Sequence, residues 1–422
     1  MKITNQNPLG VEISYDILIV GAGQAGARVA QHLREAGYAG SVLMVGEEPY
    51  LPYERPPLSK EFLARECDQA SLMLHAEDYW SELDVQMHLG VRVEALDRTQ
   101  RRATLSDGAV VRYGKVVIAT GGAPRQLSLP GSGAGQLLTL RTLADAHHLR
   151  DTFANVGRLA IIGGGVIGLE VASTARKAGL AVQVFEAGPS PMGRVLCSVA
   201  SQWLGTLHKD AGVVLHFGVQ LERIEQIENG FMVQATGSNN ERIIYEADLA
   251  VAAIGIDVEQ GFLTDAGLGN ARGVRVDAYC RSVVDENCYA VGDVAWADNV
   301  YMGQPFRQET WRNAENQAQA VAQFIMGTRT EPYEELPWMW TDQHGRNIQV
   351  VGSPVDVTET VVRGEPGKEP FSIYWLRNGA LRGGVMVDSG RDRRFLEKLT
   401  AAGKIISSES LADPAVSLKS LL

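Results

Sequence analysis

Cysteine is scarce in this sequence, and so are long apolar runs and positive charge. Among 422 residues there are four cysteines, Cys67, Cys197, Cys280 and Cys288, and none forms a C-x-x-C pair. We therefore expect neither a disulfide framework nor a clustered metal site. We interpret the four cysteines as reduced thiols that mainly fill space in the core.

Neither a membrane span nor a secretion signal is expected. The longest apolar run, around Leu249–Ile256, has about a third of the length that a bilayer span needs. The opening segment, MKITNQNPLGVEIS, carries one lysine and no apolar core, so it does not resemble a signal peptide. These features predict a cytoplasmic protein.

Basic residues number 39 against 50 acidic ones, and the resulting net charge of -11 argues against nucleic-acid binding. Hydrophobic residues make up 45% and charged residues 21%, which is typical of a folded globular protein. The length suits about two to four domains. Glycine is abundant, with 45 residues, and its positions carry the strongest signal.

One strand–turn–helix–strand pattern occurs twice, each time with G-x-G-x-x-G in the turn and an acid after the second strand. The first copy consists of Asp16–Val20, the glycines Gly21, Gly23 and Gly26, a helix to about Ala36, Ser41–Val45 and Glu47. The second copy consists of Arg158–Ile162, the glycines Gly163, Gly165 and Gly168, a helix to about Ala178, Ala181–Phe185 and Glu186. The acids follow the last glycine by 21 and 18 residues.

This context makes the glycine motif informative, because an isolated G-x-G-x-x-G opens many helices for steric reasons alone. In a dinucleotide site the first glycine forms the tight turn, the second lets the backbone approach a pyrophosphate, and the third lets helix and strand pack closely. The helix N-terminus then faces the negative charge, and the acid accepts a hydrogen bond from a ribose hydroxyl. We therefore expect two dinucleotides to bind this chain.

Two further apolar runs end in polar segments. Lys115–Ala119 is followed by Thr120 and Gly121, and the run that begins at Cys288 ends at Gly292-Asp293. Ligands collect at the carboxyl edge of a parallel sheet, which is where such segments would lie. Asp293 alone would suit a helix N-cap equally well; the paired motifs favour a ligand contact.

The sequence changes character from about Glu331. Prolines separate short β-rich runs at Asn347–Val351, Glu359–Arg363 and Phe371–Leu376, and a helical segment near Arg393–Ala402 follows. This pattern predicts a separate α+β domain of about 90 residues.

Together these segments resemble the FAD-dependent ferredoxin reductases of bacterial oxygenase systems, of the putidaredoxin reductase and biphenyl dioxygenase reductase type, which have the glutathione-reductase fold. The resemblance runs from about Tyr15 to the C-terminus. It is carried by Pro52–Lys60 (P-Y-E-R-P-P-L-S-K), Ala119–Gly121, Gly163–Glu170, Tyr289–Asp293, Glu309–Ala314 and Leu336–Gln343 (L-P-W-M-W-T-D-Q). The R-P-P-L-S-K and P-W-x-W-x-D-Q elements are more specific than the glycines.

The resemblance implies an α/β protein with two Rossmann-like domains, one for FAD and one for NAD, and a C-terminal α+β domain. The NAD domain is inserted into the FAD domain. The expected ranges are 1–120 and 253–330 for FAD, 121–252 for NAD and 331–422 for the C-terminal domain.

It also implies site residues. The first motif would hold FAD, together with Glu47, Arg55, Lys60, Val93, Ala119, Thr120, Gly121, Arg141, Gly292, Asp293 and Trp311. The second would hold the nicotinamide coenzyme, together with Val166, Ile167, Glu170, Glu186 and Gly255. Asp293 would contact the ribitol chain, Lys60 would lie near flavin N5, held by Glu170, and Trp340 would lie over the isoalloxazine. The roles of Lys60, Glu170 and Trp340 would be catalytic.

The residues themselves support a Lys60–Glu170 pair. Three nearby prolines stiffen the segment that carries Lys60, which we expect at the start of a helix. Glu170 lies two residues past the second motif, near the expected nicotinamide. A buried lysine and a buried glutamate are each costly alone, so they would stabilise each other. Two solvated surface charges are the alternative. For Trp340 and its neighbour Trp338, one face of a strand packed into a core is the alternative.

The cysteine positions limit the chemistry. Relatives that pass electrons to a disulfide carry C-x4-C after the first β-α-β unit or C-x-x-C in the nicotinamide domain, and oxidase-type relatives carry a single cysteine near the position of Lys60. This sequence has none there. Electrons must therefore leave FAD for an acceptor outside the chain, which eliminates a disulfide reductase as the leading interpretation.

A carboxylate at the end of the second motif's strand accepts from a ribose 2′-hydroxyl but repels a 2′-phosphate, so Glu186 favours NADH over NADPH. Arg194, eight residues further on, is a weak counter-argument. We expect FAD to take a hydride from NADH and to pass single electrons to a [2Fe–2S] ferredoxin that serves a Rieske oxygenase or a cytochrome P450.

Two alternatives stay open, a rubredoxin reductase and a redox-sensing flavoprotein like apoptosis-inducing factor. The ferredoxin would bind transiently through charge, for which the candidate cations are Arg307, Arg312, Arg391, Arg393 and Arg394. A solvated helix start is the alternative for the last three. The sequence allows a monomer or a homodimer and predicts no metal site.

Overall fold

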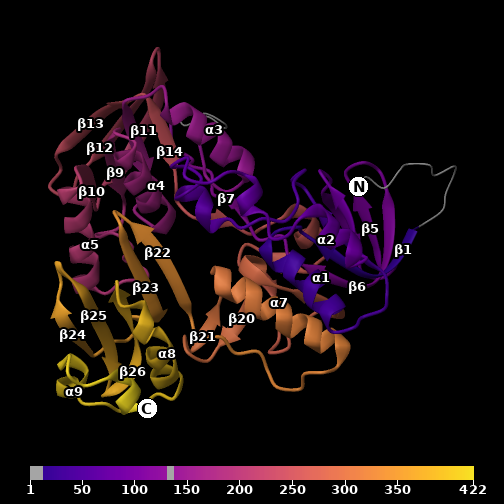
Figure 1. The fold of residues 1–422 in the computed structure, drawn as a ribbon. Coiled ribbons are helices and arrows are strands. Elements are labelled where there is room, and N and C mark those ends of the chain that lie inside the picture. Colours follow the sequence, from indigo (N-terminus) through magenta and orange to yellow (C-terminus); the bar gives the residue numbers. More distant parts are fainter. Residues whose placement is uncertain (1–12, 131–136) are drawn as a thin grey trace. The chain divides into compact units, whose positions relative to one another are not determined.

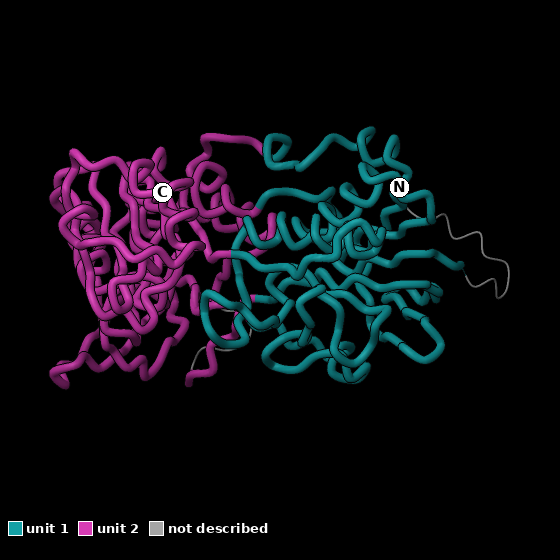
Figure 2. Tube along the Cα trace, turned by 90° about the horizontal axis from the view of Figure 1, so that it is seen from below, with its two compact units in different colours: residues 1–54, 69–123, 257–335 teal, residues 55–68, 124–256, 336–422 magenta. Residues whose placement is uncertain are grey.

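A computed structural model describes residues 13–130 and 137–422. The opening segment that we judged unlike a signal peptide lies almost entirely outside these residues. The chain divides into two compact units (Figure 2). Unit 1 consists of the described residues within Met1–Glu54, Gln69–Ala123 and Asp257–Glu335, and unit 2 consists of those within Arg55–Asp68, Pro124–Ile256 and Leu336–Leu422.

Unit 1 is built on a mainly parallel sheet. In spatial order its path is β18 (Arg281–Ser282), β19 (Asp285–Ala290), β6 (Val110–Ile118), β1 (Ile13–Val20), β2 (Val42–Gly46) and β3 (Gln86–Leu89). β4 (Val93–Asp97) and β5 (Arg102–Leu105) extend it as an antiparallel branch from β6. Apolar side chains of β1 enter different cores in alternation, Ile17 and Ile19 in one and Leu18 and Val20 in the other. Both faces of the sheet are therefore buried, as parallel sheets require.

Two helices cover one face of this sheet. α1 (Gln24–Glu35) and α7 (Trp311–Met326) lie side by side in Figure 1 and share a core with Ile17 and Ile19. The remaining elements of unit 1 are α2 (Glu77–Glu82), α6 (Gly261–Asp265) and a small sheet of β16 (Gly269–Asn270), β17 (Gly273–Arg275), β20 (Ala295–Asn299) and β21 (Gln304–Phe306). β7 (Ala123–Pro124) and β15 (Ile256–Asp257) lie at two of the five places where the chain passes from one unit to the other.

The first part of unit 2 repeats the strand–helix–strand pattern. Its parallel sheet has the order β10 (Val213–Phe217), β9 (Ala181–Glu186), β8 (Arg158–Ile162) and β14 (Leu249–Ala252). The helices are α3 (Leu143–Phe153), α4 (Val166–Lys177) and α5 (Ser198–Asp210). An antiparallel sheet of β11 (Gln220–Ile227), β12 (Gly230–Thr236) and β13 (Arg242–Ala247) accompanies them. The predicted strand Arg158–Ile162 is confirmed residue for residue.

The C-terminal part of unit 2 is the predicted α+β arrangement. Its antiparallel sheet has the order β22 (Trp338–Gln343), β23 (Arg346–Gly352), β26 (Ala380–Val387), β25 (Lys368–Arg377) and β24 (Glu359–Glu365), accompanied by α8 (Arg393–Ala401) and α9 (Ser408–Ala412). Its apolar residues share one core with those of β8 and β9. In the parts of the chain that are described, no helix is long and apolar enough to cross a membrane.

Candidate functional site

The first glycine motif links β1 to α1. Gly21 has φ of +114°, and a Cβ there would lie 2.3 Å from the carbonyl oxygen of Ala119. A Cβ on Gly26 would lie 2.0 Å from the carbonyl oxygen of Gly21, so the helix approaches the turn too closely for any side chain. Gly23, by contrast, faces open space, and no side chain caps the first turn of α1. The backbone N–H groups of that turn are thus placed to bind a pyrophosphate.

The second motif has the same geometry. Gly163 has φ of +110°, and Cβ atoms on Gly163 and Gly168 would lie 2.4 and 2.1 Å from backbone carbonyl oxygens. Gly165 faces open space, and α4 has no side-chain cap. In its first turn Ile167 is 41% exposed, which leaves an apolar side chain beside the open glycine. Both motifs therefore fit a dinucleotide by shape as well as by sequence.

The two terminal acids are arranged differently. Glu186, the last residue of β9, accepts hydrogen bonds from the backbone N–H groups of Gly164 and Gly188, both at 2.6 Å. Glu47 has a side chain that is 73% exposed, and its carboxylate lies 3.6 Å from Arg92. Glu186 is thus a fixed anion against its glycine turn, whereas Glu47 stands in solvent.

The other predicted FAD contacts of unit 1 lie at the carboxyl ends of β6 and β19. Ala119, Thr120 and Gly121 follow β6, and Gly292 and Asp293 follow β19. The Thr120 hydroxyl is buried and has no hydrogen-bond partner among the described residues. A buried hydroxyl without a hydrogen-bond partner destabilises the fold unless a bound ligand supplies that partner. This edge of unit 1 therefore fits a bound FAD.

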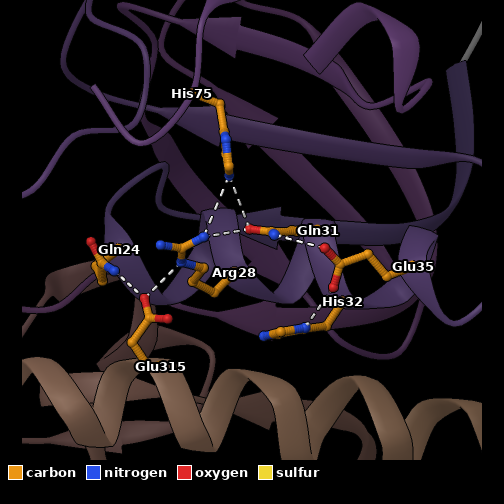
Figure 3. A network of polar contacts seen from close by, with 7 residues as sticks. All are labelled: Gln24, Arg28, Gln31, His32, Glu35, His75 and Glu315. Carbon is orange, nitrogen blue, oxygen red and sulfur yellow. Dashed lines mark hydrogen bonds and ion pairs between the residues drawn. The ribbon is translucent and has the colours of Figure 1, made fainter. Parts of the chain in front are cut away.

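A polar network joins the two helices behind the first motif (Figure 3). Arg28 Nε on α1 lies 2.7 Å from Glu315 Oε1 on α7, and Gln24 donates to the same carboxylate. Gln31 accepts a hydrogen bond from Arg28 at 2.6 Å, and His75 lies 3.4 Å from the same guanidinium nitrogen. The network fixes α1 relative to α7, whose first residue is the predicted FAD contact Trp311.

The predicted Lys60–Glu170 pair is present in unit 2. Lys60 Nζ lies 3.4 Å from Glu170 Oε1, with side chains that are 11% and 3% exposed. Burial raises the pKa of Glu170, and the nearby Lys60 cation opposes that rise. The alternative of two solvated surface charges is therefore wrong.

Lys60 lies at the end of a helix and not at its start as predicted. The 3₁₀ helix Pro56–Ser59 precedes it, with prolines in its first turn, and Lys60 is the residue that ends it. Proline fixes φ and lacks an N–H, so a Pro-Pro pair is tolerated in a first turn and starts this helix earlier.

Two hydroxyls that we had not assigned complete the cluster. Ser59 donates to Glu170 Oε2, and Thr341 donates to Glu170 Oε1 at 2.6 Å. Both lie inside the sequence elements that carry the resemblance, next to Lys60 and Trp340. The sequence signal was thus present, but hydroxyl residues are too common for spacing alone to single them out.

Trp340 lies beside the pair. Its ring centroid is 5.5 Å from Lys60 Nζ and 5.3 Å from that of Trp338, and the two indoles are stacked. Both tryptophans are only half-buried, so they are not simple core residues of β22. Arg393 lies over the Trp338 ring at 4.5 Å.

The other predicted contacts are placed as follows. Arg55 donates a hydrogen bond to the backbone carbonyl of Arg141, and Val93 is a buried core residue of β4. Val166 is the first residue of α4. Gly255 has φ of +99° and open space beside it. Their roles toward a cofactor stay predictions.

Two of the four cysteines, Cys280 and Cys288, are buried, and the other two are half-buried. No disulfide is present in the described parts of the chain, and no cluster of His, Cys, Asp and Glu there suits a metal ion. Burial raises the pKa of Cys280 to about 12 and also raises that of Cys288. Reactive cysteines have lowered pKa values, so these two are inert.

Comparison with known proteins places this geometry in a family. Residues 15–318 match the pyridine nucleotide-disulphide oxidoreductase model, and residues 338–422 match the reductase C-terminal model. The chain is 36% identical to the ferredoxin reductase subunit of a 5,5'-dehydrodivanillate O-demethylase from Sphingobium sp. over 96% of this chain and 98% of the relative. It is 37% identical to the ferredoxin–NAD(+) reductase subunit of a benzene 1,2-dioxygenase system from Pseudomonas putida, over 96% and 97%.

Solved structures agree. The ferredoxin reductase for the CYP199A2 system from Rhodopseudomonas palustris has a TM-score of 0.91 at 34% identity, covering 96% of this chain and 99% of that one. The putidaredoxin reductase–putidaredoxin complex has a TM-score of 0.89 at 31% identity, covering 96% and 98%. An NADH:rubredoxin oxidoreductase from Clostridium acetobutylicum, at 20% identity, shares the fold alone. The resemblance found in the sequence is confirmed: the chain belongs to the pyridine nucleotide-disulphide oxidoreductase family and carries its reductase C-terminal domain.

Proposed function

We propose that this protein is an NADH-dependent ferredoxin reductase that binds FAD and supplies a [2Fe–2S] ferredoxin of an oxygenase or cytochrome P450 system. The relatives named as ferredoxin reductase components support this assignment along nearly the whole chain. The observation that carries it is the composition of the buried cluster around Glu170: a lysine, two hydroxyls and a neighbouring indole.

That cluster contains charge and hydrogen-bond donors but no electron store of its own. The segment Arg55–Glu66, which carries Ser59 and Lys60, has no cysteine. Cys280 and Cys288 belong to unit 1 and are buried with raised pKa values. We therefore propose that electrons entering this site leave it for an acceptor outside the chain.

The chain's residues have distinct tasks in this proposal. The two open glycine turns bind pyrophosphates through backbone N–H groups, and Thr120 completes a hydrogen bond to FAD. Lys60 supplies a positive charge in a partly water-excluded site, where it favours a developing negative charge, and Glu170 holds the lysine in place. Bound FAD supplies the exchange between hydride transfer and single-electron transfer.

Glu186 supports the preference for NADH. Two backbone N–H groups hold its carboxylate against the second glycine turn, so the negative charge cannot swing away from an incoming ribose. A 2′-hydroxyl can donate to that carboxylate, whereas a 2′-phosphate would be repelled by it.

The candidate docking cations differ in availability. Arg307 lies 2.6 Å from Glu309, and Arg312 lies 2.8 Å from Glu335, so their charges are largely neutralised. Arg391, which lies just before α8, and Arg394, in the first turn of α8, are exposed. We therefore propose these two as ferredoxin contacts, with a weak, salt-sensitive association. The proposal includes the cytoplasmic location expected from the sequence.

The test is NADH-driven reduction of cytochrome c by the purified yellow protein, with and without an added [2Fe–2S] ferredoxin, repeated with NADPH. We expect strong dependence on ferredoxin and a clear preference for NADH. A rate that responds to rubredoxin and not to ferredoxin would favour the rubredoxin reductase alternative. A slow rate with every acceptor would favour the redox-sensing flavoprotein.

A further inference from the structure

A continuous chain of hydrogen bonds in unit 2 ends at Glu170. Thr341 Oγ1 donates to Glu170 Oε1 at 2.6 Å, and Gln343 Nε2 donates to Thr341 Oγ1 at 2.9 Å. His208 Nε2 lies 2.8 Å from Gln343 Oε1, and His344 Nε2 lies 3.1 Å from His208 Nδ1. The chain thus joins α4, β22, α5 and the turn between β22 and β23.

The inner members of this chain are fully buried. Thr341, Gln343 and His208 are at most 1% exposed, so each needs a partner for every polar atom that it presents. His344 is the half-buried outer end. It sits in a tight turn with φ of +49°, and its backbone N–H donates to Ser173 Oγ at 2.7 Å. The backbone of this outer residue is therefore anchored to Ser173 of α4.

The hydrogen bonds of the chain have one direction. The Thr341 hydroxyl has a single proton, and it uses this proton to donate a hydrogen bond to Glu170. Its oxygen therefore accepts the hydrogen bond from the Gln343 amide. That amide then presents its oxygen to His208, which must carry its proton on Nε2. Burial lowers the pKa of His208 to about 4, so the ring is neutral at pH 7 and its Nδ1 accepts from His344. Every donor in the chain therefore points towards Glu170.

The charged groups around this chain of hydrogen bonds are consistent with donors that point towards Glu170. Lys60, which follows the 3₁₀ helix Pro56–Ser59, faces Glu170, and Asp342 of β22 lies 4.0 Å from Lys60 Nζ. Burial lowers the pKa of His344, and the Arg176 cation of α4 lowers it further. A glutamine amide cannot hand a proton onward without changing its bonding. The chain therefore orients Glu170 and does not conduct protons to it.

We propose that Thr341, Gln343 and His208 are positioning residues that keep Glu170 ionised and directed at Lys60. Donors aligned towards a carboxylate favour its charged form, and burial alone would disfavour that form. The functional meaning of this proposal rests on the proposed function, in which the Lys60–Glu170 pair is the reactive cluster. The chain of hydrogen bonds is a property of unit 2, and its effect on Glu170 is testable without any electron acceptor.

The test removes one link at a time in the holoenzyme. Thr341→Val, Gln343→Met and His208→Phe are compared by ¹³C NMR of protein labelled at the glutamate carboxyl carbon, with the Glu170 signal assigned from Glu170→Gln. We expect the titration midpoint of Glu170 to rise by about one pH unit or more in Thr341→Val. The rise should be smaller in Gln343→Met and smallest in His208→Phe, because each link lies further from the carboxylate.

Conservative variants separate this role from simple packing. Thr341→Ser and His208→Gln each keep a donor at the right place and should return the midpoint to near its original value. The matched control is His216→Gln, since His216 Nε2 lies 2.8 Å from Gln183 Oε1 in the same unit but outside the chain. It should leave the Glu170 midpoint unchanged.

Two results would overturn the proposal. A shift confined to Thr341→Val would show that the histidine and the glutamine have no influence on Glu170. Equal shifts in His208→Phe and His216→Gln would show a general effect of lost packing. Since the NMR titration uses neither NADH nor ferredoxin, a failure of the proposed reductase activity is distinguishable from a failure of this proposal.

Discussion

The two glycine motifs carry opposite charges at one equivalent position, two residues past the last glycine. In unit 1 this residue is Arg28, whose Nε lies 2.7 Å from Glu315, and the two side chains are 17% and 19% exposed. In unit 2 it is Glu170, which lies 3.4 Å from Lys60, and those side chains are only 3% and 11% exposed. The same position on the same local scaffold thus holds an ion pair in both units.

The surroundings of the two pairs differ in kind. Arg28 belongs to a network that joins two helices, and its partners lie on elements that support the first motif (Figure 3). Glu170 receives two hydroxyl donors and a lysine, and every one of its partners points at the carboxylate. We therefore propose that unit 1 uses this position to join the helices that carry the predicted FAD contacts, whereas unit 2 uses it for the proposed reactive cluster.

The largest expected difference between the units is in their stability at acid pH. The pKa of His208 is about 4 in the fold against 6.5 for an ordinary histidine, so the unfolded state binds more protons between these values. This contribution to stability is complete above pH 6.5 and is lost as pH falls towards 4, by roughly 3 kcal/mol. Hydrogen exchange with mass spectrometry should therefore show unit 2 opening before unit 1 near pH 5.

The contrast with unit 1 has a structural reason. Its buried histidine, His88, lies 3.1 Å from the carboxylate of Asp107, whereas His208 faces an amide and another histidine. His208→Gln should remove most of the acid sensitivity of unit 2. Earlier opening of unit 1 would contradict this account.

Breaking the two ion pairs should affect different properties. Lys60→Met should slow the anaerobic reduction of bound flavin by NADH about a hundredfold, because an oriented charge in a water-excluded site is lost. Arg28→Met should change this rate by less than about threefold. Stopped-flow absorbance of the flavin measures both rates.

Lys60→Met leaves Glu170 buried without a counter-charge, so its stability must be controlled. The double variant Lys60→Met with Glu170→Gln removes both charges and should recover stability while the rate stays low. If the double variant recovers the rate as well, the pair is structural and the contrast between the units fails.

The two terminal acids provide a third contrast. Glu186→Ala should raise the ratio of kcat/KM for NADPH to that for NADH about tenfold, because the fixed charge that opposes a 2′-phosphate is removed. Glu47→Ala, which removes the exposed acid of the first motif, should leave this ratio unchanged. Steady-state kinetics with both coenzymes measure this ratio in each variant. An equal change in the two variants would contradict the assignment of the second motif to the nicotinamide coenzyme.

The smallest expected effect concerns the network of Figure 3. Glu315→Gln weakens the ion pair to Arg28 and should lower the free energy of unfolding by about 1 kcal/mol, because the pair is partly exposed. Loss of flavin on dilution should become faster as α1 and α7 loosen. Urea unfolding and flavin fluorescence measure the two effects; an unchanged flavin retention would argue against a fastening role.

Much of the fold could be predicted because its signals are local. The glycine turns, the β-branched strands around them and the proline-separated C-terminal strands all appear at the expected places. The Lys60–Glu170 pair was also predictable, because the two residues lie in motifs with specific spacing.

The rest of the site depends on contacts between distant segments. Ser59 and Thr341 meet Glu170 from positions 111 and 171 residues away in sequence, and His208 meets Gln343 across 135 residues. Serine, threonine and glutamine occur in every part of a protein surface, so their partners become evident only when the fold brings them together. The start of the 3₁₀ helix before Lys60 was misplaced because consecutive prolines suit a first turn.

The most direct test of the central claim is an anaerobic titration of the reductase and an excess of [2Fe–2S] ferredoxin with NADH, followed by the visible absorbance of the ferredoxin. NADH supplies an electron pair and a [2Fe–2S] centre accepts one electron, so about two ferredoxins should be reduced for each NADH consumed. Wild-type protein should reach this ratio rapidly, and Lys60→Met should reach it slowly. Flavin reduction without any reduction of ferredoxin would contradict the account.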